Sequence, residues 1–238
     1  GIGIGFSTII PAQTLGQNWF LSHRALVLGV IFAFGGIVGR LVAPADIWVL
    51  EHSDWRVGWT AIAAISMTLA VIAALLVRET PEVLGQRRDG AEPGALMAPG
   101  TTEHMASVAD RWTAAQAIRT PQFVLMLVCG VAYSVPWNTI VPHLTLHMMD
   151  VGHPEAVAIG FVGTMAFISI GGRLMGAVGD WISPQYALSV ALALEGLGAG
   201  GLLLAADTTL ATLAIAMIAL GFGMAYISTP VVFSHFFG

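Results

Sequence analysis

The chain has 238 residues, of which 56% are hydrophobic and only 10% are charged, and its mean hydropathy is +0.81. Soluble domains usually contain about 25% charged residues, so this chain cannot cover the surface of a water-soluble globule, and it is too apolar to be disordered. Nine basic residues, all of them Arg, stand against fourteen acidic ones, which leaves no basic surface for nucleic acid. The composition therefore indicates an integral membrane protein, with the lipid bilayer as its first partner.

Long apolar stretches follow one another along the chain, and none shows the period-two alternation of a β-barrel strand. Because a helix crosses a bilayer with about 20 apolar residues, each stretch predicts a membrane-spanning helix. The intervening segment 78–119 is polar, and we expect it to lie outside the membrane. Seven spans can be placed, at about residues 1–17, 24–48, 55–77, 120–149, 154–178, 184–206 and 208–233.

Capping residues mark the start of several predicted helices. A side chain that can accept a hydrogen bond precedes the first turn, and in two cases proline follows it at the first helical position. Within the polar segment, Thr113 and Gln116 have the spacing of a capping box, which predicts a short interfacial helix over 113–119. The expected N-caps of the spans are Asp54, Thr120, Ser183 and Asp207.

The arginines are distributed unevenly between the two ends of the predicted helices. With alternating spans, seven fall at one end and only Arg40 and Arg56 at the other. Positive charges are enriched on the cytoplasmic side, so we expect a multi-pass protein of the cell (inner) membrane with the 78–119 loop in the cytoplasm. The seven at the cytoplasmic end are Arg24, Arg78, Arg87, Arg88, Arg111, Arg119 and Arg173.

The first and seventh spans share an unusual pattern. Each is rich in glycine in one half, is interrupted by a proline and ends in aromatic residues. Corresponding interrupted segments are typical of transporters built from repeats. A repeat of six helices predicts a twelve-helix protein, of which this chain would hold helices four to ten. The matching residues are Gly1, Gly3, Gly5, Pro11 and Trp19-Phe20 in the first span, and Gly221, Gly223, Pro230 and Phe236-Phe237 in the seventh.

Five passages of the chain have the residue pattern of one transporter family. They are Trp19–Arg24 with Gly35-Gly36, Arg78–Glu82 with Asp89-Gly90, Ala117–Phe123, Pro142-His143 with Asp150–Gly152, and Gly172–Gly176 with Gly179-Asp180. In these passages the chain resembles the major facilitator superfamily. Within it, the resemblance is to the monocarboxylate-permease and oxalate/formate-antiporter-like branch.

The resemblance implies an all-α, polytopic transmembrane helix bundle with a partial major facilitator fold. Residues 1–77 would be the end of the N-terminal six-helix half, 78–119 the cytoplasmic linker loop, and 120–238 the start of the C-terminal half. The resemblance also implies a secondary active transporter that moves a small organic anion, a monocarboxylate or a dicarboxylate, by alternating access. A coupling proton or an exchanged anion would be its second partner.

Charged residues inside membrane spans are costly and are functional hypotheses by default. Arg173 lies near the cytoplasmic end of its span, and its guanidinium suits bidentate binding of a carboxylate. Snorkelling to the interface is the alternative. The resemblance implies a substrate-binding arginine in this stretch of helix eight. Arg40 is a candidate for a second positive charge or a gate on the same pathway, with a structural ion pair or outward snorkelling as the alternative.

Two acidic residues are candidates for coupling or gating. Glu195 lies near the middle of its span, where it is protonated, paired with an arginine or engaged in helix packing. Asp180 belongs to the passage that resembles the superfamily's turn between helices eight and nine. In this chain Trp181–Pro184 stand where relatives carry basic residues after that Asp.

Polar and aromatic residues in the fourth and seventh spans are candidates for the substrate pocket, because the resemblance makes these spans the cavity-lining helices seven and ten. Pro136 and Pro142 are expected to break the fourth span and to expose backbone groups there. The candidate pocket residues are Tyr133, Trp137, Asn138 and His143 in the fourth span, and Tyr226 in the seventh.

Motifs of soluble enzymes are missing from the sequence: it has no phosphate-binding loop, no nucleophile elbow and no paired cysteine ligands. We therefore expect neither an enzyme nor a bound metal or other cofactor. His143 and His147, four residues apart without a nearby Glu, fit an outer-interface polar pair better than a zinc site. The alternatives are a major facilitator transporter of another cargo, such as a drug or a sugar-like molecule, and a non-transporting membrane sensor.

Overall fold

The computed structural model describes residues 10–20, 22–87, 89 and 113–237, without the side chains of residues 10, 39–47, 50 and 114. The described residues are mainly helical and contain no strand, only an isolated bridge between Phe20 and Asp89. The prediction of an all-α protein is therefore confirmed. In chain order the elements are α2 (Ile10–Trp19), α3 (Arg24–His52), α4 (Trp55–Leu76), η2 (Pro81–Leu84), α6 (Ala114–Ile118), α7 (Pro121–Asp150), α8 (Glu155–Met175), η3 (Gly176–Asp180), α9 (Pro184–Gly201), η4 (Leu202–Leu204) and α10 (Thr208–Phe237).

The predicted spans correspond to helices of the structure. Five are long and apolar enough to cross a membrane: α4, α7, α8 with η3, α9 with η4, and α10. In α3, the described residues include a shorter apolar stretch, Arg24–Val38. The first predicted span is seen as α2 from Ile10 onward. Its glycines at positions 1 to 5, on which the predicted repeat depends, lie outside the described residues.

Most of the expected helix caps form. Thr113 and Gln116 make both hydrogen bonds of the predicted capping box, at the start of α6. The Ser183 side chain makes no capping hydrogen bond, so that expectation was wrong, although Pro184 does occupy the first position of α9. The other three caps accept backbone N–H groups as predicted: Asp54 from Arg56, Thr120 from Phe123, and Asp207 from Thr209 and Leu210.

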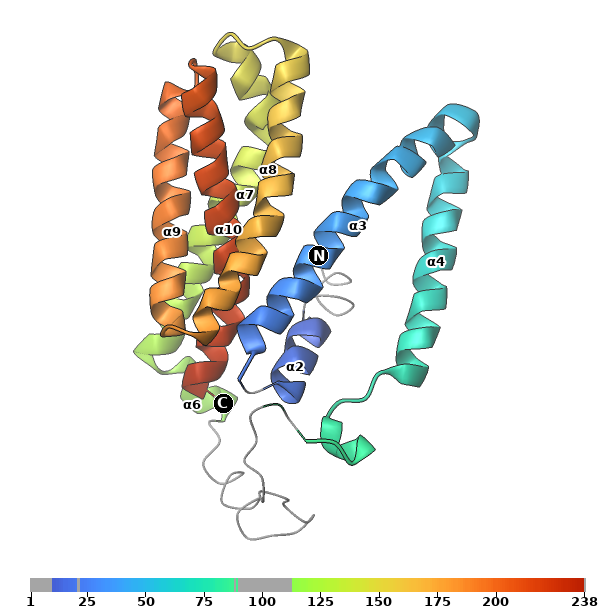
Figure 1. Ribbon diagram of the computed structural model, residues 1–238, viewed down its shortest axis with the longest axis vertical. Helices are drawn as coiled ribbons and strands as arrows, with labels where there is room; N and C mark the ends of the chain where they lie inside the picture. The colour runs from blue at the N-terminus through green and yellow to red at the C-terminus, as the bar shows by residue number, and fades with distance from the viewer. Residues whose placement is uncertain (1–9, 21, 88, 90–112, 238) are drawn as a thin grey trace.

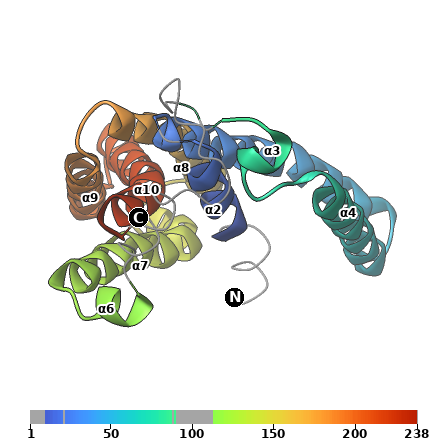
Figure 2. The ribbon, with the colours of Figure 1, turned by 90° about the horizontal axis from the view of Figure 1, so that it is seen from below.

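Helices α7 to α10 form a bundle in which α10 lies between α7, α8 and α9 (Figures 1 and 2). Helix α3 packs against α8 and η3 at one end of the molecule and leans away from the bundle towards the other end (Figure 1). We call the first end, with the start of α3, η3 and α6, the linker end, and the other the distal end. Helix α4 runs back along the outer side of α3, and none of its residues is buried.

The start of the predicted linker docks beside the turn between α2 and α3. The indole Nε1 of Trp19 donates a hydrogen bond to the Arg78 carbonyl at 3.0 Å. His23 Nδ1 lies 2.7 Å from an Asp89 carboxylate oxygen. These contacts hold the segment after α4 at the linker end of the molecule.

Glycines allow α10 to approach both α8 and α9 closely. A methyl group at Gly223 would lie 2.5 Å from the Ser169 carbonyl oxygen of α8, and one at Gly221 would lie 2.5 Å from the Ala191 carbonyl oxygen of α9. Both distances are well below van der Waals contact, and glycine is the residue that lets membrane helices pack backbone to backbone. The two contacts bring α8 and α9 to the same turn of α10.

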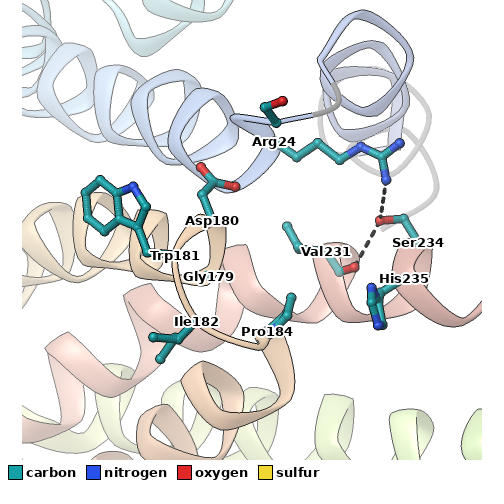
Figure 3. A pocket seen from close by; sticks show the side chains of 10 residues that line it. Arg24, Gly179, Asp180, Trp181, Ile182, Pro184, Val231, Ser234 and His235 are labelled. Carbon is teal, nitrogen blue, oxygen red and sulfur yellow. Dashed lines mark hydrogen bonds between the residues drawn. The ribbon is translucent and has the colours of Figure 1, made fainter. Parts of the chain in front are cut away.

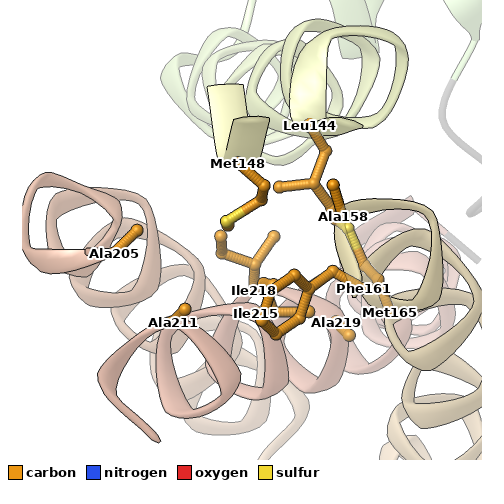
Figure 4. Close-up of a cluster of buried hydrophobic side chains, with 10 residues drawn as sticks. All are labelled: Leu144, Met148, Ala158, Phe161, Met165, Ala205, Ala211, Ile215, Ile218 and Ala219. Atoms are coloured by element: carbon orange, nitrogen blue, oxygen red, sulfur yellow. The ribbon is translucent and has the colours of Figure 1, made fainter. Parts of the chain in front are cut away.

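The distal half of the bundle is filled by a hydrophobic cluster from α7, α8 and α10 (Figure 4). Its members interdigitate around the α10 side chains, and beside it His153 Nε2 donates a hydrogen bond to the Ala205 carbonyl at 2.6 Å. This bond ties the turn before α8 to the turn before α10. The largest members of the cluster are Leu144, Met148, Phe161, Met165, Ile215 and Ile218.

Candidate functional site

Arg173 lies in the last turn of α8, where that helix packs against both α10 and α3. A methyl group at Gly223 of α10 would lie 2.7 Å from the Arg173 backbone nitrogen. From the other side, a methyl group at Gly29 of α3 would lie 2.6 Å from the Arg173 carbonyl oxygen. Glycines on two neighbouring helices therefore hold the backbone of Arg173 at the junction between α3 and the bundle.

The guanidinium of Arg173 extends between Tyr226 of α10 and Gly36 of α3. Its Cζ atom lies 5.8 Å from the centroid of the Tyr226 ring, within the range of a cation–π interaction. The Nε atom is buried without a hydrogen-bond partner among the described residues. No carboxylate in the described part of the chain forms an ion pair with this side chain. The geometry thus presents a largely buried cation whose charge the described residues do not compensate.

Five aromatic side chains form a connected group next to Arg173, which we call the aromatic cluster: Phe32, Tyr133, Trp137, Phe222 and Tyr226. Trp137 stacks on Phe222 with 3.8 Å between ring centroids. The Phe222 centroid also lies 6.0 Å from that of Tyr133 and 5.8 Å from that of Tyr226. Phe32 of α3 meets Tyr226 edge to face at 5.1 Å. The site therefore has a cationic side on α8 and a flat apolar side on α3, α7 and α10.

At the linker end, Asp180 of η3 caps the N-terminus of α3. Its carboxylate oxygens accept hydrogen bonds from the backbone N–H groups of Ala25 at 2.9 Å and Leu26 at 2.8 Å. A carboxylate is favourable there because the first N–H groups of a helix are unpaired and its dipole is positive at that end. Nearby, Arg24 donates to the Ser234 hydroxyl of α10 at 3.5 Å (Figure 3). These bonds close the linker end between α3, η3 and α10.

A cavity of about 280 Å³ lies beside this contact, between the start of α3, η3 and the last turns of α10 (Figure 3). Asp180 and Arg24 line it from one side and Ser234 and His235 from the other. The cavity is therefore a feature of the contact that closes the linker end, separate from the aromatic cluster.

The family model of the Major Facilitator Superfamily matches the chain over residues 1–238. The chain belongs to the Major Facilitator Superfamily. The match agrees with the five apolar helices of membrane length and identifies a multi-pass membrane protein of a family of secondary transporters. No match to a curated protein was found.

Three of the predicted pocket residues of this superfamily member, Tyr133, Trp137 and Tyr226, meet in the aromatic cluster. Asn138 and His143 are exposed, and the Asn138 amide donates a hydrogen bond within α7 at 2.8 Å, to the carbonyl of Ser134. The structure does not bring these two side chains into the cluster. Arg40 falls within α3, but its side chain lies outside the described residues.

Helix α7 is continuous from Pro121 to Asp150, so the predicted break at Pro136 and Pro142 is wrong. Membrane helices tolerate proline because neighbouring helices, side chains and small local adjustments satisfy the carbonyls that proline leaves unpaired. Helix α7 therefore contributes to the aromatic cluster through side chains on one face.

Glu195 belongs to α9, packs against Gly221 of α10 and is only 1% exposed. Neither of its carboxylate oxygens has a hydrogen-bond partner among the described residues, and no arginine described there pairs with it. Gly221 packs against the Glu195 backbone on one side of α10, while Gly223 packs against Arg173 on another. Glu195 and Arg173 thus approach the same turn of α10 from different helices, without forming an ion pair.

Two members of the aromatic cluster, Phe32 and Phe222, were not predicted. Phe222 stands between Gly221 and Gly223, the two closest contacts of α10, so its side chain is directed to the third neighbour, α7. The pattern of a bulky residue between two glycines in a membrane span could therefore have predicted that Phe222 faces a third helix. Phe32 lies one turn before Gly36 on α3. It could be identified only from the packing of α3 against α10, where it meets Tyr226.

Proposed function

We propose that this protein is a secondary active transporter of small organic anions, monocarboxylates or dicarboxylates, and that Arg173 binds the carboxylate. The observation that carries the proposal is the uncompensated guanidinium, which has no acidic partner among the described residues and a buried Nε without a hydrogen bond. A charge inside a membrane protein is costly unless a partner compensates it. A carboxylate supplies that partner through two parallel N–H···O bonds.

The surroundings of Arg173 favour a small anion over other cargo. A cationic drug would meet a like charge, and the aromatic cluster contains no acidic residue to offset it. A sugar needs many polar partners, whereas the cluster offers two tyrosine hydroxyls and one indole N–H. The resemblance of Gly172–Gly176 and Gly179-Asp180 to the oxalate/formate-like branch supports the same substrate class.

Alternating access would act through the contact at Asp180. Helix α3 touches the bundle at the linker end and leans away from it at the distal end (Figure 1), as in an arrangement closed on the linker side. We propose that residues 1–77 and 120–238 rock about the site as two halves joined by the 78–119 linker. Because the arginine excess favours a cytoplasmic linker, opening to the cytoplasm would require Asp180 to release the N-terminus of α3.

Two further residues belong to this proposal. Glu195, buried without a partner among the described residues, would carry the coupling proton, because a carboxyl group in such surroundings is far less costly when neutral. Arg40 follows Gly36 by one turn of α3 and would add a second positive charge to the same path. Asn138 and His143, which are exposed on α7, would line the transport path.

Uptake by the full-length protein in proteoliposomes tests the role of Arg173. Arg173→Ala should lower the uptake of radiolabelled lactate and oxalate about 100-fold, because losing one partner of a buried charged pair costs about 2–5 kcal/mol. Arg119→Ala removes an exposed charge at the same end of the molecule and should leave uptake unchanged. Normal insertion with unchanged uptake and KM in Arg173→Ala would overturn the proposal, and efflux of cationic drugs by that variant would favour the drug-transport alternative.

A further inference from the structure

Gly35 and Gly36 of α3 are neighbours in the sequence but face different surroundings. A methyl group at Gly36 would lie 2.8 Å from the Arg173 Nη1 atom and 3.0 Å from Ile170 Cγ1. A methyl group at Gly35 would have no atom within 4 Å. The missing side chain of Gly36 therefore leaves room for the Arg173 guanidinium, whereas the missing side chain of Gly35 does not affect it.

The guanidinium is confined on two sides. Tyr226 of α10 lies on one side, 5.8 Å from ring centroid to Cζ, and the α3 backbone at Gly36 lies on the other. Phe32, one turn before Gly36, contacts the same Tyr226 ring. A side chain at Gly36 would therefore displace the guanidinium rather than fill empty space. Because Arg173 presents a rigid fork of N–H donors, a small displacement changes its alignment with a carboxylate.

We propose that Gly36 is a positioning residue for the anion site: its missing side chain fixes where the Arg173 guanidinium lies and so sets the affinity for the carboxylate. The inference rests on the proposed function, since it acts through Arg173. On this inference, α3 and the bundle both contribute to the anion site. Movement of α3 away from α8 would then withdraw the support that holds the guanidinium in place.

The matched pair Gly36→Ala and Gly35→Ala tests this role in the full-length protein. Initial rates of lactate and oxalate uptake are measured against substrate concentration in proteoliposomes. Gly36→Ala should raise KM about 10-fold and leave the maximal rate within about twofold, because the two parallel hydrogen bonds to a carboxylate weaken steeply when the guanidinium moves out of line. Gly35→Ala should match the wild type. A general folding defect would instead lower the maximal rate, which counts the active molecules, and leave KM unchanged.

Two double variants assign the effect to the guanidinium. With Ile170→Ala, which removes the other close neighbour, Gly36→Ala should still raise KM. With Arg173→Lys, which replaces the guanidinium by a compact ammonium group, Gly36→Ala should raise KM no further. If Gly36→Ala alone fails to insert, the Arg173→Lys background should restore insertion, because the contact with Nη1 is gone. Failure of the double variant to insert would locate the clash elsewhere and overturn the inference.

The outcomes separate this inference from the proposed function. Equal KM values for Gly36→Ala and Gly35→Ala, with Arg173→Ala inactive, would overturn the role of Gly36 and leave the anion site standing. A Gly36→Ala effect that persists in the Arg173→Lys background would overturn it in the same way. Uptake that survives in Arg173→Ala would overturn both.

Discussion

Helices α4 and α10 are both apolar enough to span a membrane, yet their surroundings differ completely. No residue of α4 is buried, whereas α10 is buried over most of its length between α7, α8 and α9. Small residues alone do not make the difference, because α4 also contains six alanines and a glycine. In α10 the glycines face neighbouring helices, with Gly221 against α9 and Gly223 against α8. Hydropathy therefore indicates that a helix can span the membrane, whereas its burial depends on which neighbouring helices pack against it. The buried small residues of α10 include Ala211, Ala214, Ala219, Gly221, Gly223 and Ala225.

The largest effect is expected where α10 meets α8 backbone to backbone. Gly223→Leu should abolish folding, because the side chain would meet backbone atoms of Ser169 and Arg173 and exceed the usual overpacking cost of about 1–3 kcal/mol. Gly196→Leu on α9 is the matched control, since a methyl group there has no atom within 4 Å. The yield of monodisperse protein in size-exclusion chromatography measures the difference. Equal yields for the two variants would show that this contact does not organise the bundle.

An intermediate effect is expected in the hydrophobic cluster. Ile215→Ala on α10 removes a fully buried side chain and should cost about 2–5 kcal/mol of unfolding free energy. Ile65→Ala on α4 removes one that is 60% exposed and should cost less than about 0.5 kcal/mol. Unfolding of the purified variants in detergent provides the comparison. Similar losses at both positions would mean that α4 is packed as tightly as α10.

A smaller effect is expected where α3 and η3 touch. Asp180→Ala removes two charge-assisted hydrogen bonds to the start of α3, which contribute about 1.5–3 kcal/mol when the acceptor is ionised. A short bifunctional cross-linker between Gln17→Cys and Pro230→Cys, whose parent residues share a 3.1 Å hydrogen bond, reports closure of the linker end. The cross-linking yield should fall about 10-fold in Asp180→Ala.

Asp150→Ala removes an exposed carboxylate at the distal end and serves as the control for that experiment. Its cross-linking yield should equal that of the parent protein. An undiminished yield in Asp180→Ala would show that other contacts hold the linker end closed.

Features that depend only on residues close together in the sequence could be predicted. The spans follow from hydropathy, and the caps at Asp54, Thr113 and Asp207 follow from neighbouring residues. Arg173 stood out because a charge within a span is costly. The predicted break of α7 at Pro136 and Pro142 failed, because satisfaction of the freed carbonyls depends on the helix's surroundings.

Features set by contacts between helices were not predictable. Phe32 and Gly36 belong to the site only because α3 crosses α8 and α10 at that level. Phe222 joins it because the flanking glycines direct it towards Trp137. Apolar periodicity carries no information on which helices cross, so Phe32 and Gly36 could be assigned to the site only from the packed structure.

The central claim is that Arg173 binds a carboxylate, and its most direct test compares a carboxylate with an uncharged analogue of the same shape. Equilibrium binding of lactate and lactamide to the purified full-length protein is measured by calorimetry for the wild type and for Arg173→Gln. The account predicts that the wild type prefers lactate by about 10-fold or more, since a charge-assisted pair is worth about 1.5–3 kcal/mol, and that Arg173→Gln loses this preference. Equal binding of both compounds by the wild type, or a preference for lactate that survives in Arg173→Gln, would contradict it.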